Sequence, residues 1–358
     1  MSKSFHKLTI SKVEHLTEDA VALTFDVPDA LAHEYDFLPG QYLTLRADVK
    51  GEDIRRSYSI CAAKDQDLRV GIKKVNGGRF STYAQTLAVG QTLEVMPPEG
   101  RFVCAPDQGQ GRNLILIAAG SGITPVLSIA RSVLENEPAA SVTLVYGNRM
   151  TSSIMFREEV EDLKDRFVER FHMYHVLSQE MQDVELFYGR IDVERVAQMV
   201  EKGIIAPQVA DEIFLCGPMQ MTADLIEYFT SNGIAAEKLK SELFKTAEHS
   251  EPAVVSDATL KAVEEGVTVD VILDGVTRNF VFSDAQDTVL SAAEKSGLDL
   301  PFSCAGGMCA TCRCKVTEGE AEMDKNFSLD DLELEAGFVL ACQSRPKTEK
   351  LVLDFDAI

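Results

Sequence analysis

Residues 304–312 read Cys-Ala-Gly-Gly-Met-Cys-Ala-Thr-Cys, and a fourth cysteine, Cys342, follows after 29 intervening residues. This C-x4-C-x2-C spacing with a distant fourth Cys is typical of plant-type [2Fe–2S] ferredoxins. Two irons bridged by two sulfides need four converging thiolates, so most ligands must come from one tight loop. The glycines let the backbone wind closely, and its N–H groups are expected to point at the sulfurs. We predict that the cluster ligands are Cys304, Cys309, Cys312 and Cys342.

Two other interpretations of these cysteines are a zinc site and buried structural thiols. Zinc sites usually combine two close-spaced cysteine pairs, whereas Cys342 stands alone. Cys314 fits no ligand position and is expected to pack in a strand.

The 358 residues are enough for two or three domains. The formal net charge of −22 argues against binding to nucleic acid or to an anionic membrane surface. The longest apolar stretch, residues 114–119, is far shorter than the ~20 residues of a membrane span. The first residues contain no apolar signal core, so a cytoplasmic protein is expected. In that compartment, eight cysteines favour metal ligation over disulfides.

Charge and hydrophobic pattern divide the chain into three domains and a linker. Residues 264–358 carry a net charge of −11, as much as the first 263 residues together, which indicates a distinct acidic module. Residues 246–264 have no clear apolar period and are interpreted as a linker. The predicted domains are residues 1–106, 107–245 and 265–358.

Each domain has its own pattern. Alternation in residues 1–106, such as Val21, Leu23 and Phe25, predicts an antiparallel β-barrel. Residues 107–245 alternate apolar strands with helices, which predicts a parallel α/β sheet. Its expected strands are 114–118, 142–146, 171–177 and 213–216. In the C-terminal domain we expect a hairpin of 267–273 with 277–282, then a helix from about Thr288 to Gly297, with Asp287 as its N-cap.

The first domain carries side chains suited to a flavin. In the expected strand Arg56-Ser57-Tyr58-Ser59, Arg56 can pair with a pyrophosphate, Tyr58 can stack on an isoalloxazine ring, and Ser59 can bond near flavin N5. Downstream, glycines precede a helix expected from Tyr83 with a Ser/Thr cap, which would bind phosphate. This second motif comprises Gly77, Gly78, Arg79, Phe80, Ser81 and Thr82. Each motif alone also suits an ordinary strand or capped helix, but their order and separation favour a flavin.

The second domain carries a nucleotide signature. The strand at 114–118 runs into Gly120-Ser121-Gly122-Ile123-Thr124-Pro125 and an apolar helix. Such a turn can place backbone N–H groups on a pyrophosphate, for which Gly120, Gly122, Thr124 and Pro125 are candidates. The alternative is a plain tight turn between strand and helix.

Two further strand ends in this domain suit the rest of a dinucleotide. Asn148 and Arg149 follow the second strand, where an adenosine ribose would lie. Arg149 could hold a 2′-phosphate, which favours NADPH over NADH, although a surface Arg needs no ligand. Cys216, Gly217 and Pro218 end the fourth strand and suit close approach of a nicotinamide. A buried core Cys is the alternative for Cys216.

In this combination and order, the motifs resemble the ferredoxin–NADP reductase superfamily with a fused C-terminal plant-type ferredoxin of β-grasp fold. The resemblance covers essentially the whole chain. Within this superfamily the chain is most similar to the reductases of phenylacetyl-CoA epoxidases. The similar stretches are residues 55–61, 77–81, 146–150, 155–157, 339–343 and 354–357. Met150 departs from relatives, which often have Thr there.

The resemblance implies FAD as the flavin and places Glu242 and Phe244 near it, beside Ser59 and Cys216, as catalytic residues. It also implies electron flow from NAD(P)H through FAD and the [2Fe–2S] cluster to an oxygenase component. That component would be a di-iron epoxidase acting on an aromatic acyl-CoA in phenylacetate catabolism, a substrate that this chain is not expected to bind. The alternatives are a reductase serving a Rieske-type or ketosteroid hydroxylase, and a non-catalytic redox sensor that signals through its cluster.

Acidic residues crowd the segment between the third and fourth cluster ligands. Either they form a docking face for a basic patch on the oxygenase, or they only keep the surface solvated. The residues are Glu318, Glu320, Glu322, Asp324, Asp330, Asp331, Glu333 and Glu335.

Overall fold

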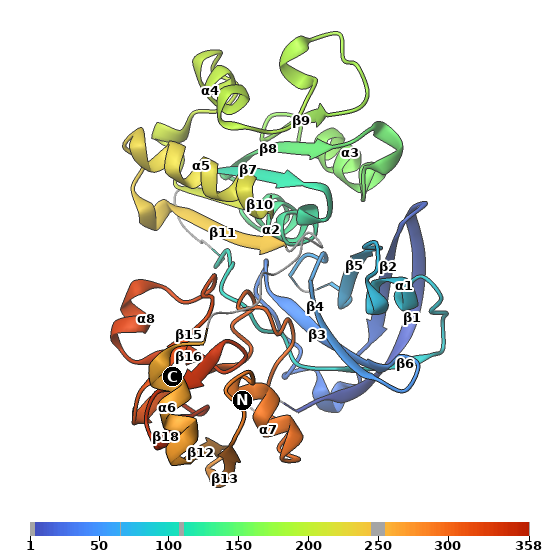
Figure 1. Cartoon of the computed structure of the whole chain (residues 1–358). Coiled ribbons are helices and arrows are strands. Elements are labelled where there is room, and N and C mark those ends of the chain that lie inside the picture. Colours follow the sequence, from blue (N-terminus) through green and yellow to red (C-terminus); the bar gives the residue numbers. More distant parts are fainter. Residues whose placement is uncertain (1–3, 65, 107–110, 245–254, 358) are drawn as a thin grey trace. The chain divides into compact units, whose positions relative to one another are not determined.

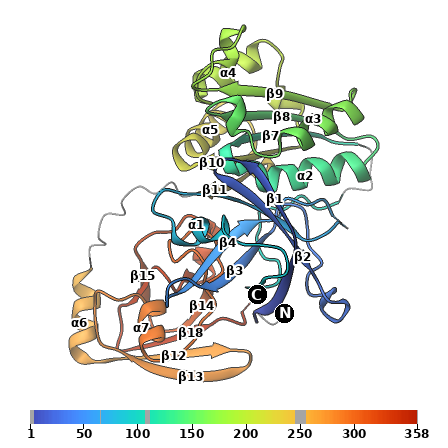
Figure 2. The same cartoon turned by 90° about the vertical axis from the view of Figure 1, so that its right-hand side faces the viewer.

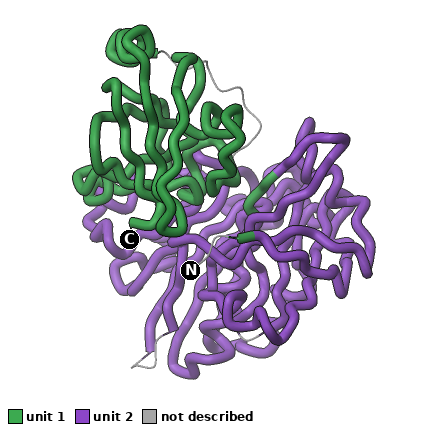
Figure 3. Tube along the Cα trace, turned by 90° about the horizontal axis from the view of Figure 1, so that it is seen from below, with its two compact units in different colours: residues 1–4, 55–57, 249–358 green, residues 5–54, 58–248 purple. Residues whose placement is uncertain are grey.

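A computed structural model describes residues 4–64, 66–106, 111–244 and 255–357 (Figure 1). The chain divides into two compact units, one of residues 5–54 and 58–248 and the other of residues 1–4, 55–57 and 249–358 (Figure 3). The expected boundary at residue 107 and the first part of the expected linker lie outside the described residues, so the domain limits stay a prediction. No helix in the described ranges is long and apolar enough to cross a membrane.

The first domain is an antiparallel β-barrel, as predicted. Its six strands follow the order β4-β3-β6-β1-β2-β5, and a bridge between Ile60 and Val70 brings the two edges together. A short helix, α1 (Arg79–Ala84), follows β5. The strands are β1 (His6–Thr17), β2 (Ala20–Asp26), β3 (Tyr42–Asp48), β4 (Asp53–Ser59), β5 (Arg69–Lys73) and β6 (Thr92–Val95).

Strand β2 shows why this sequence makes a barrel that also supports a second domain. Its large residues, including Val21 and Leu23, point into the barrel core. The alternating small residues Ala20 and Ala22 belong instead to the core of the α/β domain. Because successive strand residues face opposite sides, β2 joins both cores in one unit.

The second domain is a parallel sheet in the order β11-β10-β7-β8-β9, with helices on both faces (Figures 1 and 2). Alternate residues of β7 divide between two cores: Leu114 and Leu116 lie in one, and Ile115 and Ile117 lie in the other. Burial on both faces explains the solid apolar runs that predicted these strands. The strands are β7 (Asn113–Ala119), β8 (Ser141–Asn148), β9 (Phe171–Leu177), β10 (Glu212–Pro218) and β11 (Leu239–Phe244), and the helices are α2 (Ile123–Asn136), α3 (Arg157–Arg166), α4 (Val193–Glu201) and α5 (Met219–Ser231).

The C-terminal domain has a mixed five-stranded sheet in the order β13-β12-β18-β14-β16, and a separate pair, β15 and β17. The predicted hairpin is confirmed, and its first strand pairs in parallel with the last strand of the chain. The strands are β12 (Val267–Leu273), β13 (Val276–Phe282), β14 (Arg313–Glu318), β15 (Ala321–Met323), β16 (Phe338–Leu340), β17 (Ser344–Pro346) and β18 (Lys350–Asp354), and the helices are α6 (Asp257–Glu265), α7 (Val289–Lys295) and α8 (Asp331–Glu335).

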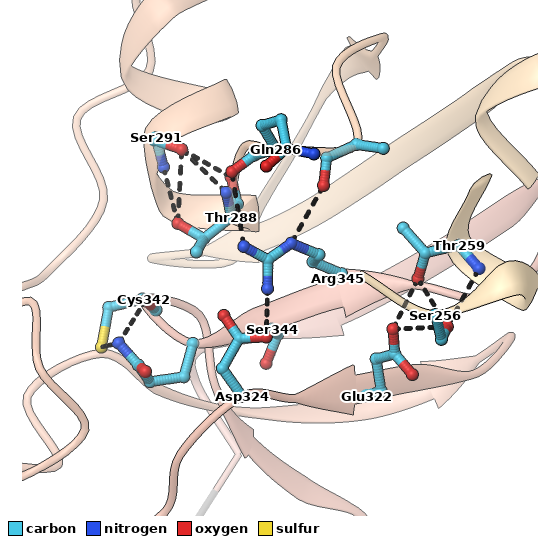
Figure 4. Close-up of polar contacts among 12 residues, drawn as sticks. Ser256, Thr259, Gln286, Thr288, Ser291, Glu322, Asp324, Cys342, Ser344 and Arg345 are labelled. Carbon is cyan, nitrogen blue, oxygen red and sulfur yellow. Dashed lines mark hydrogen bonds and ion pairs between the residues drawn. The ribbon is translucent and has the colours of Figure 1, made fainter. Parts of the chain in front are cut away.

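One expectation about a helix in this domain is wrong, and the expected linker contains a helix that was not predicted. The N-cap of α7 is Thr288, whose hydroxyl accepts a hydrogen bond from the Ser291 N–H at 3.3 Å, so the predicted cap Asp287 lies one residue too early. Part of the expected linker forms α6 instead. Both Ser256 and Thr259 at its start donate hydrogen bonds to Glu322 Oε1, at 2.6 and 2.8 Å (Figure 4). The polar composition that suggested a linker therefore supplies a helix cap.

Candidate functional site

The loop that carries three of the predicted cluster ligands has an unusual backbone. Ala305, Gly307 and Ala310 all have positive φ angles, of 47°, 77° and 53°. This left-handed region is uncommon for residues other than glycine. The winding turns backbone N–H groups towards sulfur: Gly306 N and Met308 N lie 3.3 and 3.4 Å from Cys304 Sγ.

The four predicted ligand thiols are neighbours in the structure. Hydrogen bonds from the Cys309 and Cys342 thiols, followed by those from backbone N–H groups, hold the pKa of Cys304 far below its ordinary value. Cys342 in turn contacts the thiol of Cys312. Cys314, by contrast, is buried in β14 with its Sγ 3.8 Å from Val339 O. The structure thus brings together the four residues that the spacing singled out and separates the fifth.

These residues fit an anionic iron–sulfur cluster, because hydrogen-bond donors surround the sulfurs. Two of the donors were not foreseen from the sequence. Thr311 Oγ1 lies 3.2 Å from Cys309 Sγ, and Gln343 Nε2 lies 3.7 Å from Cys342 Sγ. A polar side chain next to each ligand was the available signal. No three His, Cys, Asp or Glu side chains of the described residues gather where one metal ion would fit, so the assignment rests on loop geometry and these contacts.

The nucleotide motif lies at the point where the parallel sheet reverses its strand order. From β7 the chain moves outward to β8 and β9 on one side, then returns to β10 and β11 on the other. Ligands of open α/β sheets bind at the carboxyl ends of the strands at this switch point. Gly120 follows β7 with φ of 56° and open space beside its Cα. The first turn of α2 follows without a side-chain cap, which leaves backbone N–H groups for a pyrophosphate.

Gly122 has a packing role of its own. A Cβ at this position would lie 2.2 Å from the backbone oxygen of Cys216, so only glycine lets the turn pack on β10. Thr124 is also tied locally, because its hydroxyl donates to Ser121 O at 3.0 Å. Helix α2 begins at Ile123, so Pro125 is buried within its first turn rather than at its start, where we expected it.

The adenosine end of the expected nucleotide site contains a buried donor. Asn148 is 8% exposed, and its Nδ2 has no hydrogen-bond partner among the described residues. Arg149 next to it is well exposed, and its Nη2 lies 3.7 Å from Asp19 Oδ2 of the barrel. Asp19 could not be foreseen, because the pair joins distant segments of the chain. A buried donor beside an exposed guanidinium suits a polar ligand such as a ribose phosphate.

The predicted catalytic residues meet at the ends of three strands. Ser59 of β4 donates a hydrogen bond from Oγ to Glu242 Oε2 at 3.0 Å. Glu242 lies on β11 opposite Cys216 of β10, and Phe244 lies opposite Pro218. Gly217 lies between Cys216 and Pro218 in β10. A Cβ on Gly217 would lie 3.1 Å from the Cβ of Ala119.

Burial controls the charge of this cluster. It raises the pKa of Glu242 to about 7, against the opposing effect of the Ser59 hydrogen bond. It also raises the pKa of Cys216 well above the ordinary value, and the Glu242 charge adds to this. The Cys216 thiol therefore stays neutral, which argues against a role as a nucleophile. Ser59 and Glu242 remain as the polar pair that can hold or move a proton.

The flavin motif in β4 is partly as expected. Tyr58 is half-buried, with its ring 5.6 Å from that of Phe80, while Arg56 is exposed and donates to Arg55 O at 2.7 Å. Ser57 lies between them in the strand. An exposed guanidinium can pair with a pyrophosphate and a half-buried aromatic ring can stack on a flavin, so the use of these residues for FAD stays a prediction.

The predicted Ser/Thr cap of the next helix is wrong. Helix α1 begins at Arg79 rather than Tyr83, and its N-cap is Gly78, in extended conformation. The hydroxyls of Ser81 and Thr82 lie inside the first turn and donate back to Gly78 O at 3.3 and 2.7 Å. Gly77, at φ of 73°, turns the chain into the helix. Phosphate binding by this segment therefore stays a prediction that would rest on Arg79 and the backbone.

Comparisons with known proteins agree with this division of the chain. Residues 7–104 match the oxidoreductase FAD-binding domain, residues 116–226 the oxidoreductase NAD-binding domain, and residues 271–347 the 2Fe-2S iron-sulfur cluster binding domain. The predicted FAD, pyridine-nucleotide and [2Fe–2S] domains are thus confirmed.

Two curated relatives cover nearly the whole chain. A component of the 1,2-phenylacetyl-CoA epoxidase from Escherichia coli (strain K12) is 42% identical over 99% of this chain and 98% of the relative. The ferredoxin reductase component of 3-ketosteroid-9-alpha-monooxygenase from Rhodococcus rhodochrous is 33% identical over 97% and 96%. The solved structure of phthalate dioxygenase reductase is 22% identical over 98% of each chain, with a TM-score of 0.58, and shares the fold. The chain belongs to the family of NAD(P)H oxidoreductases in which an FAD-binding domain, an NAD-binding domain and a C-terminal 2Fe–2S domain are joined, a family that includes reductase components of oxygenases.

Proposed function

We propose that this oxidoreductase passes electrons from NAD(P)H to a di-iron phenylacetyl-CoA epoxidase, with FAD and a [2Fe–2S] cluster as resident carriers. The observation that carries the proposal is the 42% identity with the Escherichia coli epoxidase component over 99% of the chain. When bound, FAD supplies hydride chemistry and the cluster supplies transfer of single electrons. The cytoplasmic location stays a prediction.

In this proposal, the residues of the chain bind, orient and exclude water. The turn at Gly120 and the start of α2 would hold the pyrophosphate, and the buried end of β10 at Cys216 would border the nicotinamide. The hydrogen-bonded pair of Ser59 and Glu242 would hold or move a proton beside the flavin, which would supply the hydride chemistry. The four cysteines hold the cluster in a loop whose N–H groups lower the cost of its negative charge.

Reconstitution with the purified partner tests the acceptor. Neighbouring reading frames show which oxygenase to purify, a carboxylate-bridged di-iron protein or a Rieske protein. We expect NADPH-driven epoxidation of an aromatic acyl-CoA with the di-iron component. The 33% identity with the ketosteroid component makes a steroid hydroxylase the second candidate, and turnover with that component alone would replace our assignment. Absence of NAD(P)H-dependent cytochrome c reduction would instead favour a redox sensor.

Arg149 is proposed to favour NADPH by pairing with its 2′-phosphate. Charge-assisted hydrogen bonds contribute roughly 1.5–3 kcal/mol to binding. Because the Arg149 side chain is 60% exposed and solvent screens its charge, we expect a contribution at the low end of this range. Arg149→Ala is expected to lower the preference for NADPH about tenfold, measured as the ratio of kcat/KM for NADPH and NADH.

Asp19→Asn provides the matched control for that experiment. The substitution releases Arg149 from its ion pair and is expected to leave the preference unchanged or raise it. If Arg149→Ala leaves the ratio where it was, the 2′-phosphate lies elsewhere and the NADPH proposal fails.

The acidic segment between the third and fourth ligands is less free than its sequence suggested. Glu318, Glu320 and Glu333 form ion pairs with basic residues of their own domain, at 2.7, 3.1 and 2.8 Å. Glu322 accepts hydrogen bonds from Ser256 and Thr259 at the start of α6, and Asp324 pairs with Arg345. What remains is the α8 surface, an exposed set with acidic and apolar members. It consists of Asp330, Asp331, Leu332, Leu334 and Glu335.

We propose that the α8 surface docks a basic patch of the oxygenase. Complementary charge mainly raises the association rate, and salt screens it over a Debye length of ~8 Å at physiological ionic strength. Electron transfer from the pre-reduced protein to the oxygenase is therefore expected to slow several-fold between low and high salt, measured by stopped-flow mixing.

Two double variants distinguish docking through the α8 surface from a general effect of the net charge of the protein. Asp331→Asn with Glu335→Gln is expected to flatten the salt dependence. Glu194→Gln with Glu201→Gln removes the same net charge from α4. This second double variant is expected to keep the salt dependence of the parent protein. A rate constant that is flat with salt in the parent protein would mean that these acids only keep the surface solvated.

A further inference from the structure

A buried arginine stands close to the fourth predicted cluster ligand. Arg345 lies in β17, three residues after Cys342, and is 4% exposed (Figure 4). Each residue adds at most about 3.6 Å to the length of a chain, so the two Cα atoms are within about 11 Å. A charge this deeply buried is costly unless it is paired and hydrogen-bonded.

The guanidinium of Arg345 joins three segments of the domain. Its Nε donates to Ala285 O at 3.0 Å and its Nη2 to Gln286 O at 3.3 Å, both in the turn before α7. Its Nη1 forms an ion pair with Asp324, whose side chain is 15% exposed. Figure 4 shows the guanidinium between Gln286 and Asp324, with Cys342 in the same region.

The ion pair connects directly to the residues around the cluster loop. Asp324 N donates to Gln343 O at 2.9 Å. The Gln343 side chain donates to Ala305 O at 3.3 Å and lies 3.7 Å from Cys342 Sγ. Gly307 packs closely here as well, because a Cβ on it would lie 3.2 Å from Gln343 Cγ. The pair therefore fixes the frame that holds both the cluster loop and the fourth ligand.

The two charges of the pair act on the cluster in opposite directions. Reduction adds one negative charge to the cluster, so a buried cation nearby favours the reduced state and a buried anion disfavours it. Charges interact strongly across a short, poorly screened distance inside a protein, and nearby groups are among the determinants of iron–sulfur potentials. The net influence depends on how completely Asp324 compensates Arg345.

We propose that the Arg345–Asp324 ion pair positions Cys342 and sets the reduction potential of the [2Fe–2S] cluster. The inference rests on the cluster assignment above. It adds two positioning residues that act through the frame of the cluster and through their charge, without binding iron.

Potentiometric titration of the purified full-length chain, followed by the visible absorbance and electron paramagnetic resonance of the cluster, tests the proposal. Asp324→Asn leaves the buried guanidinium uncompensated and is expected to raise the potential. Arg345→Gln leaves the carboxylate and is expected to lower it. Each shift is expected to reach at least about tenfold in the equilibrium constant for reduction, or about 59 mV for one electron. The double variant is expected to return towards the parent potential.

Two more variants separate charge from geometry. Arg345→Lys keeps the charge but loses the planar fork that reaches both carbonyls, so it should keep the potential and lose the cluster faster on standing. Glu320→Gln breaks the exposed pair with Lys347 in the same domain and is expected to shift the equilibrium constant by less than about threefold, because solvent screens the pair.

The outcomes are distinguishable. Shifts of the reduction potential in opposite directions in Asp324→Asn and Arg345→Gln support the proposal. Shifts in the same direction, or no shift, would mean that the pair stabilises the fold without setting the potential. If Arg345→Gln binds no cluster, Asp324→Asn decides alone, and an unchanged or lowered potential overturns the proposal. If the parent protein shows no cluster spectrum, the cluster assignment itself fails.

Discussion

Replacement of Cys312 by serine is expected to stop electron transfer to one-electron acceptors while leaving the flavin reactions intact. Cys312 is 2% exposed and its thiol is a neighbour of Cys342. Iron–sulfur clusters prefer thiolate ligands, and a serine hydroxyl is far less acidic than a thiol, so the cluster absorbance is expected to be lost. NADPH-dependent reduction of ferricyanide, which needs only the flavin, should persist, and reduction of cytochrome c should fall to background.

Cys314→Ser is the matched control, because Cys314 is equally buried and only two residues away but contacts the backbone of Val339. This variant is expected to keep the cluster and the full rate of cytochrome c reduction. Loss of the cluster in Cys314→Ser with retention in Cys312→Ser would contradict the ligand assignment.

Ser59→Ala and Glu242→Ala are each expected to slow reduction of the flavin by NADPH about a hundredfold. The Ser59 hydroxyl is buried and held by Glu242, and loss of such positioning can cost about that factor through misplacement of the reacting groups. Stopped-flow traces over a series of NADPH concentrations separate the rate of reduction from nucleotide binding, which should change little. Ser241→Ala, at an exposed neighbour of Glu242 on β11, should react like the parent. Unchanged reduction rates in both alanine variants would remove these residues from the reaction.

The raised pKa of Glu242 gives this step a pH dependence. Burial shifts the pKa upward to about 7, so the side chain is a neutral acid below that pH and a carboxylate above it. A carboxylate accepts the Ser59 hydrogen bond more strongly than a neutral acid does. Glu242→Gln resembles the neutral acid at every pH. We expect the variant and the parent to reduce flavin at equal rates about one pH unit below this pKa, and the parent to be faster about one unit above it. Parallel pH profiles would show that Glu242 does not titrate in this range.

The parts of the fold that carry local constraints could be predicted from the sequence. Cluster ligation needs a compact loop, which leaves a fixed cysteine spacing, and Cys304, Cys309 and Cys312 are adjacent in the structure for that reason. Strands buried on both faces appear as continuous apolar runs, so β7 to β10 were found within a few residues. In each case one segment of chain contains the whole signal.

Features that depend on distant partners could not be predicted in this way. Strand β11 (Leu239–Phe244) lies at a sheet edge and has half-buried residues of mixed polarity. Its sequence therefore shows no regular hydrophobic pattern, and Glu242 was placed near the flavin only by resemblance. The cap expected for α1 failed because Ser81 also accepts a hydrogen bond from Val75 N and is held inside the turn. The partners of Arg149 and Arg345 are far away in sequence, and such pairs have no local pattern.

Anaerobic mixing of the oxidised protein with NADPH tests the electron path most directly. Absorbance of the flavin and of the cluster are followed together in the parent and in Cys312→Ser. We predict that the flavin absorbance is lost first, that the cluster absorbance follows it, and that the flavin step has the same rate constant in Cys312→Ser. A cluster that stays oxidised while the flavin is fully reduced, or that is reduced before the flavin, would contradict transfer from NADPH through FAD to the cluster.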